Sequence, residues 1–229
     1  GSLKRLKTDY IDLYQVHWPD SIIPKEESMR ALDELVKSGK VRYIGTSNDT
    51  AYGLTKSNTI AQYEKLARFE SIQNNFSLLN PRFLDELSTV CKTEKISLLP
   101  YSPIGGGVLS GKYNQAFIDP KSRFGEYLHA KESRQKAMYH RFVNDKTLKA
   151  TAKYLEIAKK YDLHPVTLAV SWSMHFDFVA STIIGARYAA QLEESFKAFE
   201  VKLTPEILSE CESVQKEILY PMGDRKSVV

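Results

Sequence analysis

The sequence predicts an α/β fold in which helices cover a parallel β-sheet. Five short segments rich in β-branched and aromatic residues have the character of strands, and each is followed by a segment with helical spacing or helix-capping residues. The composition, 42% hydrophobic and 26% charged over 229 residues, is ordinary for a globular chain. No repeat, low-complexity tract or linker divides the sequence, so we expect a single domain over residues 1–229.

The elements alternate along the chain. Strands are predicted at 10–17, 41–47, 69–75, 96–103 and 179–186. Helices are predicted at 26–40 (with Gly39 as the stop signal), about 50–67, 80–95 (opened by Asn80 and Pro81), 147–163, 165–176, 189–200 and 204–219. The polar and aromatic stretch 114–145 predicts a long irregular loop. Periodicity does not distinguish an open doubly wound sheet from part of a barrel.

Polar residues follow the predicted strands. His17 ends the first strand, Ser47 and Asn48 the second, and Gln73 the third, whereas Tyr101 and Gly185 end the last two. Function concentrates at the carboxyl ends of parallel strands, so these residues predict a site. A histidine met alone is as readily a structural residue, and Tyr101 alone is as readily a core aromatic.

Two segments could bind an anion. In "YSPIGGGVLSGKY" (101–113) the glycines permit close backbone approach, and Lys112 adds a positive charge. This stretch is neither a Walker loop nor a GxGxxG fingerprint, and a flexible turn with a surface lysine is the alternative. The second segment is a strand followed by Gly185, Arg187 and a helix start.

Taken together, "SLKRLKTDYIDLYQVHWPD", "GKVRYIGTSN", "SIQNNFSLLN", "YSPIGGGVLSGKY" and "STIIGA…QLEES" closely resemble the aldo-keto reductases. The branch they resemble contains Tas-like reductases, plant sugar and aldehyde reductases, and potassium-channel β-subunits. The resemblance implies a (β/α)8 TIM barrel of which this chain represents strands four to eight, the first three being absent from the sequence.

The resemblance also implies NADP(H) binding and specific residue roles. His17 matches the catalytic histidine that faces the substrate carbonyl. The matches to cofactor-binding residues fall into four groups: Ser47, Asn48 and Gln73 at the nicotinamide carboxamide; Tyr101 stacked on the ring; Ser102, Pro103, Ile104, Gly105, Gly106, Lys112 and Arg123 along the pyrophosphate; and Gly185, Arg187, Gln191, Glu194 and Ser195 around the adenosine and its 2′-phosphate.

Three departures from the family pattern stand out. None of the 13 tyrosines lies in the context of the family's acid tyrosine, and the supporting lysine and aspartate also lack a match. The loop after "HWPD" is short. Arg187 and Ser195 replace residues that are commonly small polar and asparagine; Arg187 could strengthen a 2′-phosphate contact or be a plain exposed arginine.

We therefore expect an NADPH-dependent oxidoreductase that reduces aldehydes or ketones, with a small-molecule carbonyl substrate. The alternatives are a non-catalytic NADP(H)-binding regulatory or interaction protein and a truncated inactive fragment. The charge of +4 is spread along the chain, which argues against a nucleic-acid partner. Two cysteines without metal-ligand spacing and short apolar runs predict a reduced, cytoplasmic protein with no metal and no membrane partner. The sequence leaves the substrate and the oligomeric state open.

Overall fold

The computed structural model describes residues 1–223, which form two compact units. Unit 1 comprises Gly1–Asn74, Phe83–Leu99 and Phe178–Ser181, and unit 2 comprises Asn75–Arg82, Pro100–Asp177 and the described chain from Thr182 onward. The expectation of one domain over the whole chain stays a prediction.

Unit 1 contains a four-stranded parallel sheet with the order β1-β2-β3-β4. Its strands are β1 (Ile11–Val16), β2 (Val41–Ser47), β3 (Phe69–Gln73) and β4 (Ser97–Leu98). The helices of unit 1 are α1 (Ser2–Leu6), α2 (Lys25–Lys37), α3 (Ala51–Glu64) and α4 (Leu87–Glu94), the last preceded by the 3-10 turn η1 (Arg82–Leu84). Strand order that follows chain order without a reversal is the arrangement of barrels rather than of doubly wound sheets. The predicted parallel α/β fold is confirmed.

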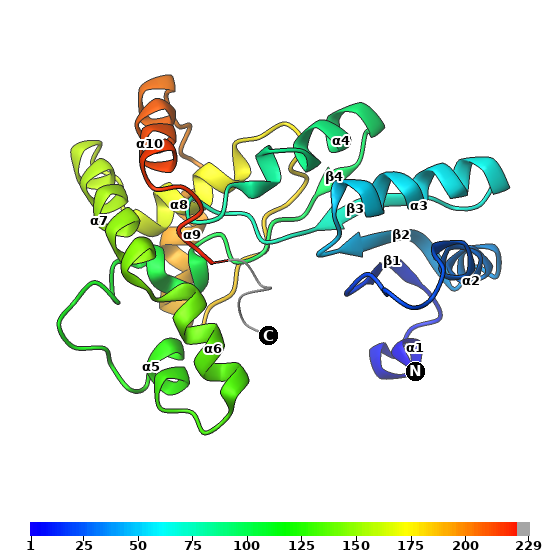
Figure 1. Cartoon of the computed structure of the whole chain (residues 1–229), viewed down its shortest axis with the longest axis horizontal. Coiled ribbons are helices and arrows are strands. Elements are labelled where there is room, and N and C mark those ends of the chain that lie inside the picture. The colour runs from blue at the N-terminus through cyan, green and yellow to red at the C-terminus, as the bar shows by residue number, and fades with distance from the viewer. Residues whose placement is uncertain (224–229) are drawn as a thin grey trace. The chain divides into compact units, whose positions relative to one another are not determined.

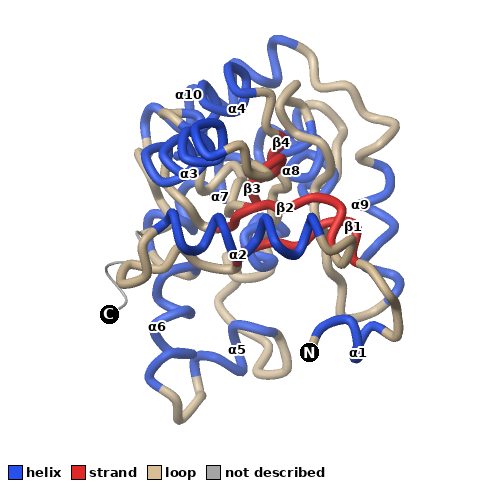
Figure 2. Tube along the Cα trace, turned by 90° about the vertical axis from the view of Figure 1, so that its right-hand side faces the viewer, coloured by secondary structure: helices blue, strands red, loops and turns tan. Residues whose placement is uncertain are grey.

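Local chemistry explains where these elements begin and end. Gly39, at φ 71°, lies just after α2 and takes the left-handed conformation that commonly follows a helix. The Thr50 hydroxyl accepts a hydrogen bond from the Gly53 amide (3.0 Å) and caps the start of α3. Helices α2 and α3 pack against each other and against β2 and β3, as Figures 1 and 2 show. The core of unit 1 therefore lies between these two helices and one face of the sheet, and includes Met29, Leu32, Ile44, Leu54, Phe69 and Ile72.

Unit 2 is mainly helical. Its elements are η2 (Gly105–Ser110), α5 (Arg123–Leu128), α6 (Ser133–Phe142), α7 (Asp145–Lys160), α8 (Pro165–Met174), η3 (Ala189–Leu192), α9 (Glu193–Lys197) and α10 (Pro205–Glu217). Asn144 and Thr147 form a capping box at the start of α7, and Thr204 with Pro205 opens α10. Helix α7 contacts α8, α10 and η2, so its buried face forms part of the core of this unit (Figure 1).

Several predicted elements need correction. The stretch 114–145 is not one irregular loop, because it contains α5 and α6. The fourth strand is only Ser97–Leu98, and no strand forms at 179–186; there, Val179 bridges to Leu98 and Ile183 bridges to Tyr101. The segments 80–95 and 189–200 each divide into a 3-10 turn and a short helix. Asn80 and Pro81 open no helix, since Ser77 and Asn80 instead exchange backbone hydrogen bonds in a turn.

Candidate functional site

The carboxyl ends of β1, β2 and β3 bring four of the predicted site residues together in unit 1. The Asn48 side-chain amide donates to the His17 backbone carbonyl (3.0 Å) and to the Ser47 hydroxyl (3.0 Å). The Ser47 hydroxyl donates to the Gln73 backbone carbonyl (2.6 Å), which also accepts from the Asn48 backbone amide (3.0 Å). One hydrogen-bonded chain thus connects three neighbouring strand ends.

Asn48 is central to this arrangement because of its backbone. Its φ of 56° lies in the left-handed region, which asparagine tolerates better than most residues. Ser47 beside it is buried, at 3% exposure, so its hydroxyl needs the bonds it makes. The asparagine therefore turns the chain after β2 and fixes the backbone of the strand end that carries His17.

Two of the four side chains remain available for a ligand. The His17 ring is exposed and lies beside Trp18, with 5.7 Å between the ring centroids. The half-buried Gln73 side-chain amide makes no hydrogen bond to any residue in the described part of the chain. Gln73 can therefore both donate to and accept from an incoming polar group, and His17 can offer a ring N–H.

In unit 2, Tyr101 is half-buried and bridges Asn75 and Ile183 in parallel fashion. Ser102 follows with φ 57°, Pro103 is buried, and Ile104 packs against Val166 and Val170 of α8. The chain therefore leaves Tyr101 through a strained residue and is then anchored on α8.

The glycine-rich loop uses its conformational freedom for packing. The Gly105 and Gly107 amides donate to the carbonyls of Ser102 and Ile104 (2.9 Å each), so these two N–H groups close turns and do not face an anion. A Cβ on Gly106 would lie 2.9 Å from the Phe124 ring, and Gly106 has φ 65°. The prediction that these amides form an anion cradle is corrected at Gly105 and Gly107, whereas the close approach expected of glycine is made by the neighbouring Phe124 side chain.

Lys112 and Arg123 are exposed cations of the same unit. The Lys112 ammonium lies 5.1 Å from the Tyr113 ring centroid, and the Arg123 guanidinium lies 5.7 Å from the ring centroids of Phe124 and Tyr127. Neither is in an ion pair with another residue of 1–223, so both can reach an anionic ligand.

Arg187 already forms hydrogen bonds and an ion pair with other residues of unit 2. Its guanidinium donates to the Lys121 carbonyl (2.5 Å) and pairs with Glu126 (2.8 Å), and its amide donates to the Gln191 side chain (2.8 Å). The hydrogen bond and charge of Glu126 raise the pKa of Arg187 above its usual value. Gly185 stands in open space, with no heavy atom near the position a Cβ would take.

Glu194 and Ser195 face α8 instead. Glu194 pairs with Lys197 (2.6 Å) and accepts from the Thr167 hydroxyl (2.9 Å), and these contacts, led by the Lys197 hydrogen bond, lower its pKa. Ser195 is buried, at 5% exposure. Helix α9 has five residues, with Glu193 and Glu194 in its first turn, and the anion site expected at this helix start stays a prediction.

Two acidic residues beside the predicted site residues were not predicted from the sequence. Glu126, which neutralises Arg187, lay in a stretch predicted to be irregular; its position four residues after Ser122, a helix-capping residue type, was the available signal. Asp49 is buried beside the Ser47–Asn48 pair, and its carboxylate lies so close to Gly53 that a Cβ there would clash with Oδ1. Within 1–223, no group of three or more His, Cys, Asp or Glu residues could hold a metal ion, and no helix is long and apolar enough to cross a membrane.

The chain is similar in sequence to several known proteins. Protein tas of Escherichia coli (strain K12) is 35% identical over 237 residues, covering 96% of this chain and 66% of that protein. An aldo-keto reductase of Babesia bovis is 30% identical, covering 85% and 76%. A protein of Oryza sativa subsp. japonica, described as a probable voltage-gated potassium channel subunit beta, is 33% identical, covering 93% and 64%.

Structural comparison agrees with these similarities. The crystal structure of a thermostable aldo-keto reductase in complex with the inhibitor epalrestat matches with a TM-score of 0.67 and 25% identity, covering 93% of this chain and 63% of that one. The chain thus spans about two thirds of the length of the Escherichia coli and rice relatives and of this structure. The sequence pattern of the Aldo/keto reductase family matches residues 1–216, and the chain therefore belongs to that family.

Proposed function

We propose that the protein containing this chain is an NADPH-dependent oxidoreductase that reduces aldehydes or ketones to alcohols. Family membership supports the reaction class. The observation that carries the proposal is the hydrogen-bonded chain His17–Asn48–Ser47–Gln73 at adjoining strand ends, which leaves the His17 ring exposed and the Gln73 amide unpaired.

The residues of unit 1 fit a nicotinamide carboxamide. A carboxamide offers one acceptor and two donors, and the free Gln73 amide can satisfy both kinds of group. Ser47 and Asn48 would hold the same end, Ser47 through its hydroxyl oxygen, which can accept a further bond, and Asn48 through its side-chain amide. In unit 2 the half-buried Tyr101 would stack on the ring, while Lys112 and Arg123 would pair with phosphates. The loop from Ser102 to Gly106 would line the pyrophosphate, together with Lys112. The residues at the adenosine end would be Gly185, Arg187, Gln191, Glu194 and Ser195.

The bound NADPH supplies a hydride. His17 would donate a ring N–H to the carbonyl oxygen of the substrate and orient it, and the same hydrogen bond would stabilise the negative charge that develops on that oxygen. Asn48 would position His17 through its backbone carbonyl. No residue of this chain is assigned as the proton donor.

Replacing His17 tests the proposal. With 4-nitrobenzaldehyde as the probe substrate, His17→Gln should lower kcat about 10²-fold, the usual cost of removing one donor to a developing oxyanion. Cofactor affinity, measured by NADPH fluorescence, should stay unchanged, because the glutamine leaves the other contacts intact. The matched control is His129→Gln, at the exposed end of α5, which should keep full activity. Equal rates for the two variants would contradict the proposal.

A second candidate function is a non-catalytic NADP(H)-binding regulatory or interaction protein. The 33% identity to the rice protein described as a channel subunit favours it. The same experiment separates the two, since this candidate predicts NADPH binding without turnover in the wild-type protein.

A further inference from the structure

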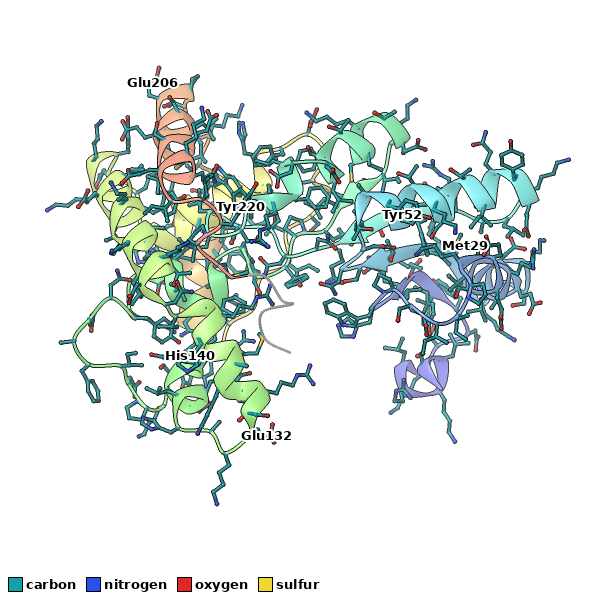
Figure 3. The ribbon with its side chains drawn as sticks, in the orientation of Figure 1. Met29, Tyr52, Glu132, His140, Glu206 and Tyr220 are labelled. Carbon is teal, nitrogen blue, oxygen red and sulfur yellow. The ribbon has the colours of Figure 1, made fainter. Side chains whose placement is uncertain are left out.

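Unit 1 contains a cavity of about 340 Å³ between the strands β1 and β2 and the helix α2. It lies on the helix-covered face of the sheet, because Tyr14 and Val16 of β1 and Met29 and Leu32 of α2 all line it. Figure 3 marks Met29 on α2. None of His17, Ser47, Asn48 or Gln73 lines this cavity, so it is separate from the proposed reaction site.

The cavity is large enough for a small organic molecule, and part of its wall is apolar. Its volume lies at the lower end of the range of small-molecule pockets, about 300–1,000 Å³, whereas one water molecule takes about 30 Å³. Val16, Met29, Leu32 and Leu35 offer no hydrogen-bonding groups, and Met29 is only 1% exposed.

One corner of the cavity is polar. The Asp49 carboxylate, whose side chain is 4% exposed, receives the Thr50 amide on Oδ1 (2.8 Å). Among the described residues, only the Thr46 hydroxyl donates a hydrogen bond to the other oxygen, Oδ2, at a long 3.3 Å. The Lys25 ammonium lies 3.9 Å from Oδ2, which is too far for a direct hydrogen bond.

We propose that this cavity binds a small uncharged alcohol or phenol, with its hydroxyl between Lys25 and Asp49 and its hydrocarbon part against Val16, Met29 and Leu32. A hydroxyl can donate to Asp49 Oδ2 and accept from Lys25 at the same time. Two atoms 3.9 Å apart can each lie within hydrogen-bond distance of one oxygen placed between them. An ammonium or a carboxylate would be attracted by one of these two charges and repelled by the other, whereas a hydroxyl can form a hydrogen bond with both.

Benzyl alcohol is a suitable probe, and toluene, benzylamine and benzoate are its matched analogues. The protein is labelled with 13C-methyl methionine and titrated without nicotinamide cofactor, so the result does not depend on the proposed reductase activity. The chain has four methionines, and a Met29→Leu variant assigns the Met29 signal. Benzyl alcohol should shift the Met29 signal and leave those of Met138, Met174 and Met222, all in unit 2, in place. Toluene, benzylamine and benzoate should bind more weakly.

The variant Lys25→Met removes the ammonium and leaves an uncharged side chain of similar length at this position. It should weaken benzyl alcohol binding about two- to tenfold, the effect of one lost hydrogen bond, and leave toluene binding unchanged. Lys37→Met is the control, since Lys37 lies on the same helix, pairs with Asp33 and does not line the cavity.

Two results would overturn the proposal. An unmoved Met29 signal at saturating benzyl alcohol would mean that the cavity takes no such ligand. Equal affinities for benzyl alcohol and toluene, unaffected by Lys25→Met, would mean that the polar corner does not recognise a hydroxyl.

Discussion

The Glu126 carboxylate lies 2.8 Å from the Arg187 guanidinium and joins α5 to the segment that precedes η3. The sequence suggested that Arg187 could be a cation for the 2′-phosphate of NADPH, whereas the structure gives it two partners in α5 and the turn before it. A 2′-phosphate reaching Arg187 would share it with Glu126. In this structure Arg187 therefore connects two segments of unit 2, and a ligand phosphate would have to compete with Glu126 for it.

We expect Arg187→Met to loosen α5. The variant loses the hydrogen bond to the Lys121 carbonyl and the ion pair with Glu126. Trypsin should then cleave after Lys121 severalfold faster than in the wild-type protein, as followed by mass spectrometry of the fragments. Arg134→Met, an exposed position on α6, should leave the rate of that cleavage unchanged. Equal rates in the two variants would mean that Arg187 does not hold α5 in place.

Gly106→Ala should destabilise the protein. The backbone at φ 65° costs alanine about 1–2 kcal/mol, and its Cβ would in addition meet the Phe124 ring at 2.9 Å. Gly185→Ala is the control, because Gly185 has no close neighbour and no positive φ. Urea unfolding followed by fluorescence measures both variants. If Gly185→Ala lowered the free energy of unfolding as much as Gly106→Ala, the backbone conformation and the Phe124 contact of Gly106 would not explain the effect.

Asp33 should contribute stability that depends on pH. Its buried carboxylate accepts from Lys37 (2.6 Å) and from the Ala67 amide (2.9 Å), and these bonds, the Lys37 bond first, lower its pKa. Since the folded pKa lies below the unfolded value of about 3.9, the stabilisation is fully present above pH 4 and is lost as the pH falls through the folded pKa. Asp33→Asn should therefore cost about 1–3 kcal/mol at pH 7 and less at pH 3, in urea unfolding at each pH.

The control for this prediction is Asp12→Asn. The Asp12 side chain is 72% exposed and pairs with Arg42 at the surface, so its replacement should change the free energy of unfolding by no more than about 0.5 kcal/mol. A pH-independent cost for Asp33→Asn would contradict the role assigned to its charge.

Neither cysteine should react with a thiol reagent in the folded protein. Cys91 and Cys211 are free and buried, and burial raises the pKa of each thiol to about 12. Because the thiolate is the reactive form, Ellman's reagent at pH 8 should titrate no thiol from these two residues until urea unfolds the chain. Rapid reaction of one thiol in the native protein would show that its unit opens.

The parts of the fold that were predictable are those fixed by local chemistry. The bounds of β2 were predicted as they occur, and Thr204 and Pro165 lie at helix starts that the sequence indicates directly. Helix α5 was missed because Phe124, its buried anchor, depends on Tyr113, Gly106 and Phe142, which are distant in the sequence. The predicted fifth strand does not form, because Ile183 and Val179 each make a single isolated bridge.

The candidate site was predictable to different degrees in the two units. His17, Ser47, Asn48 and Gln73 end strands that local patterns define, so their grouping followed from the order of the sheet. The glycine run was assigned to anion binding because a sequence does not reveal what approaches a glycine closely. The partners of Arg187 and Glu194 belong to other helices, and no short-range pattern indicates them.

The contact between Gly106 and Phe124 makes two separate stretches of chain depend on each other. Gly106, in its left-handed conformation, packs against the aromatic ring, and Phe124 and Gly125 are the buried residues of the helix that carries the ring. Residues 105–111 and 123–128 should therefore open as one cooperative unit, with amide hydrogens that exchange at a common rate. A ligand that orders the loop would thereby slow exchange in a helix that it never touches.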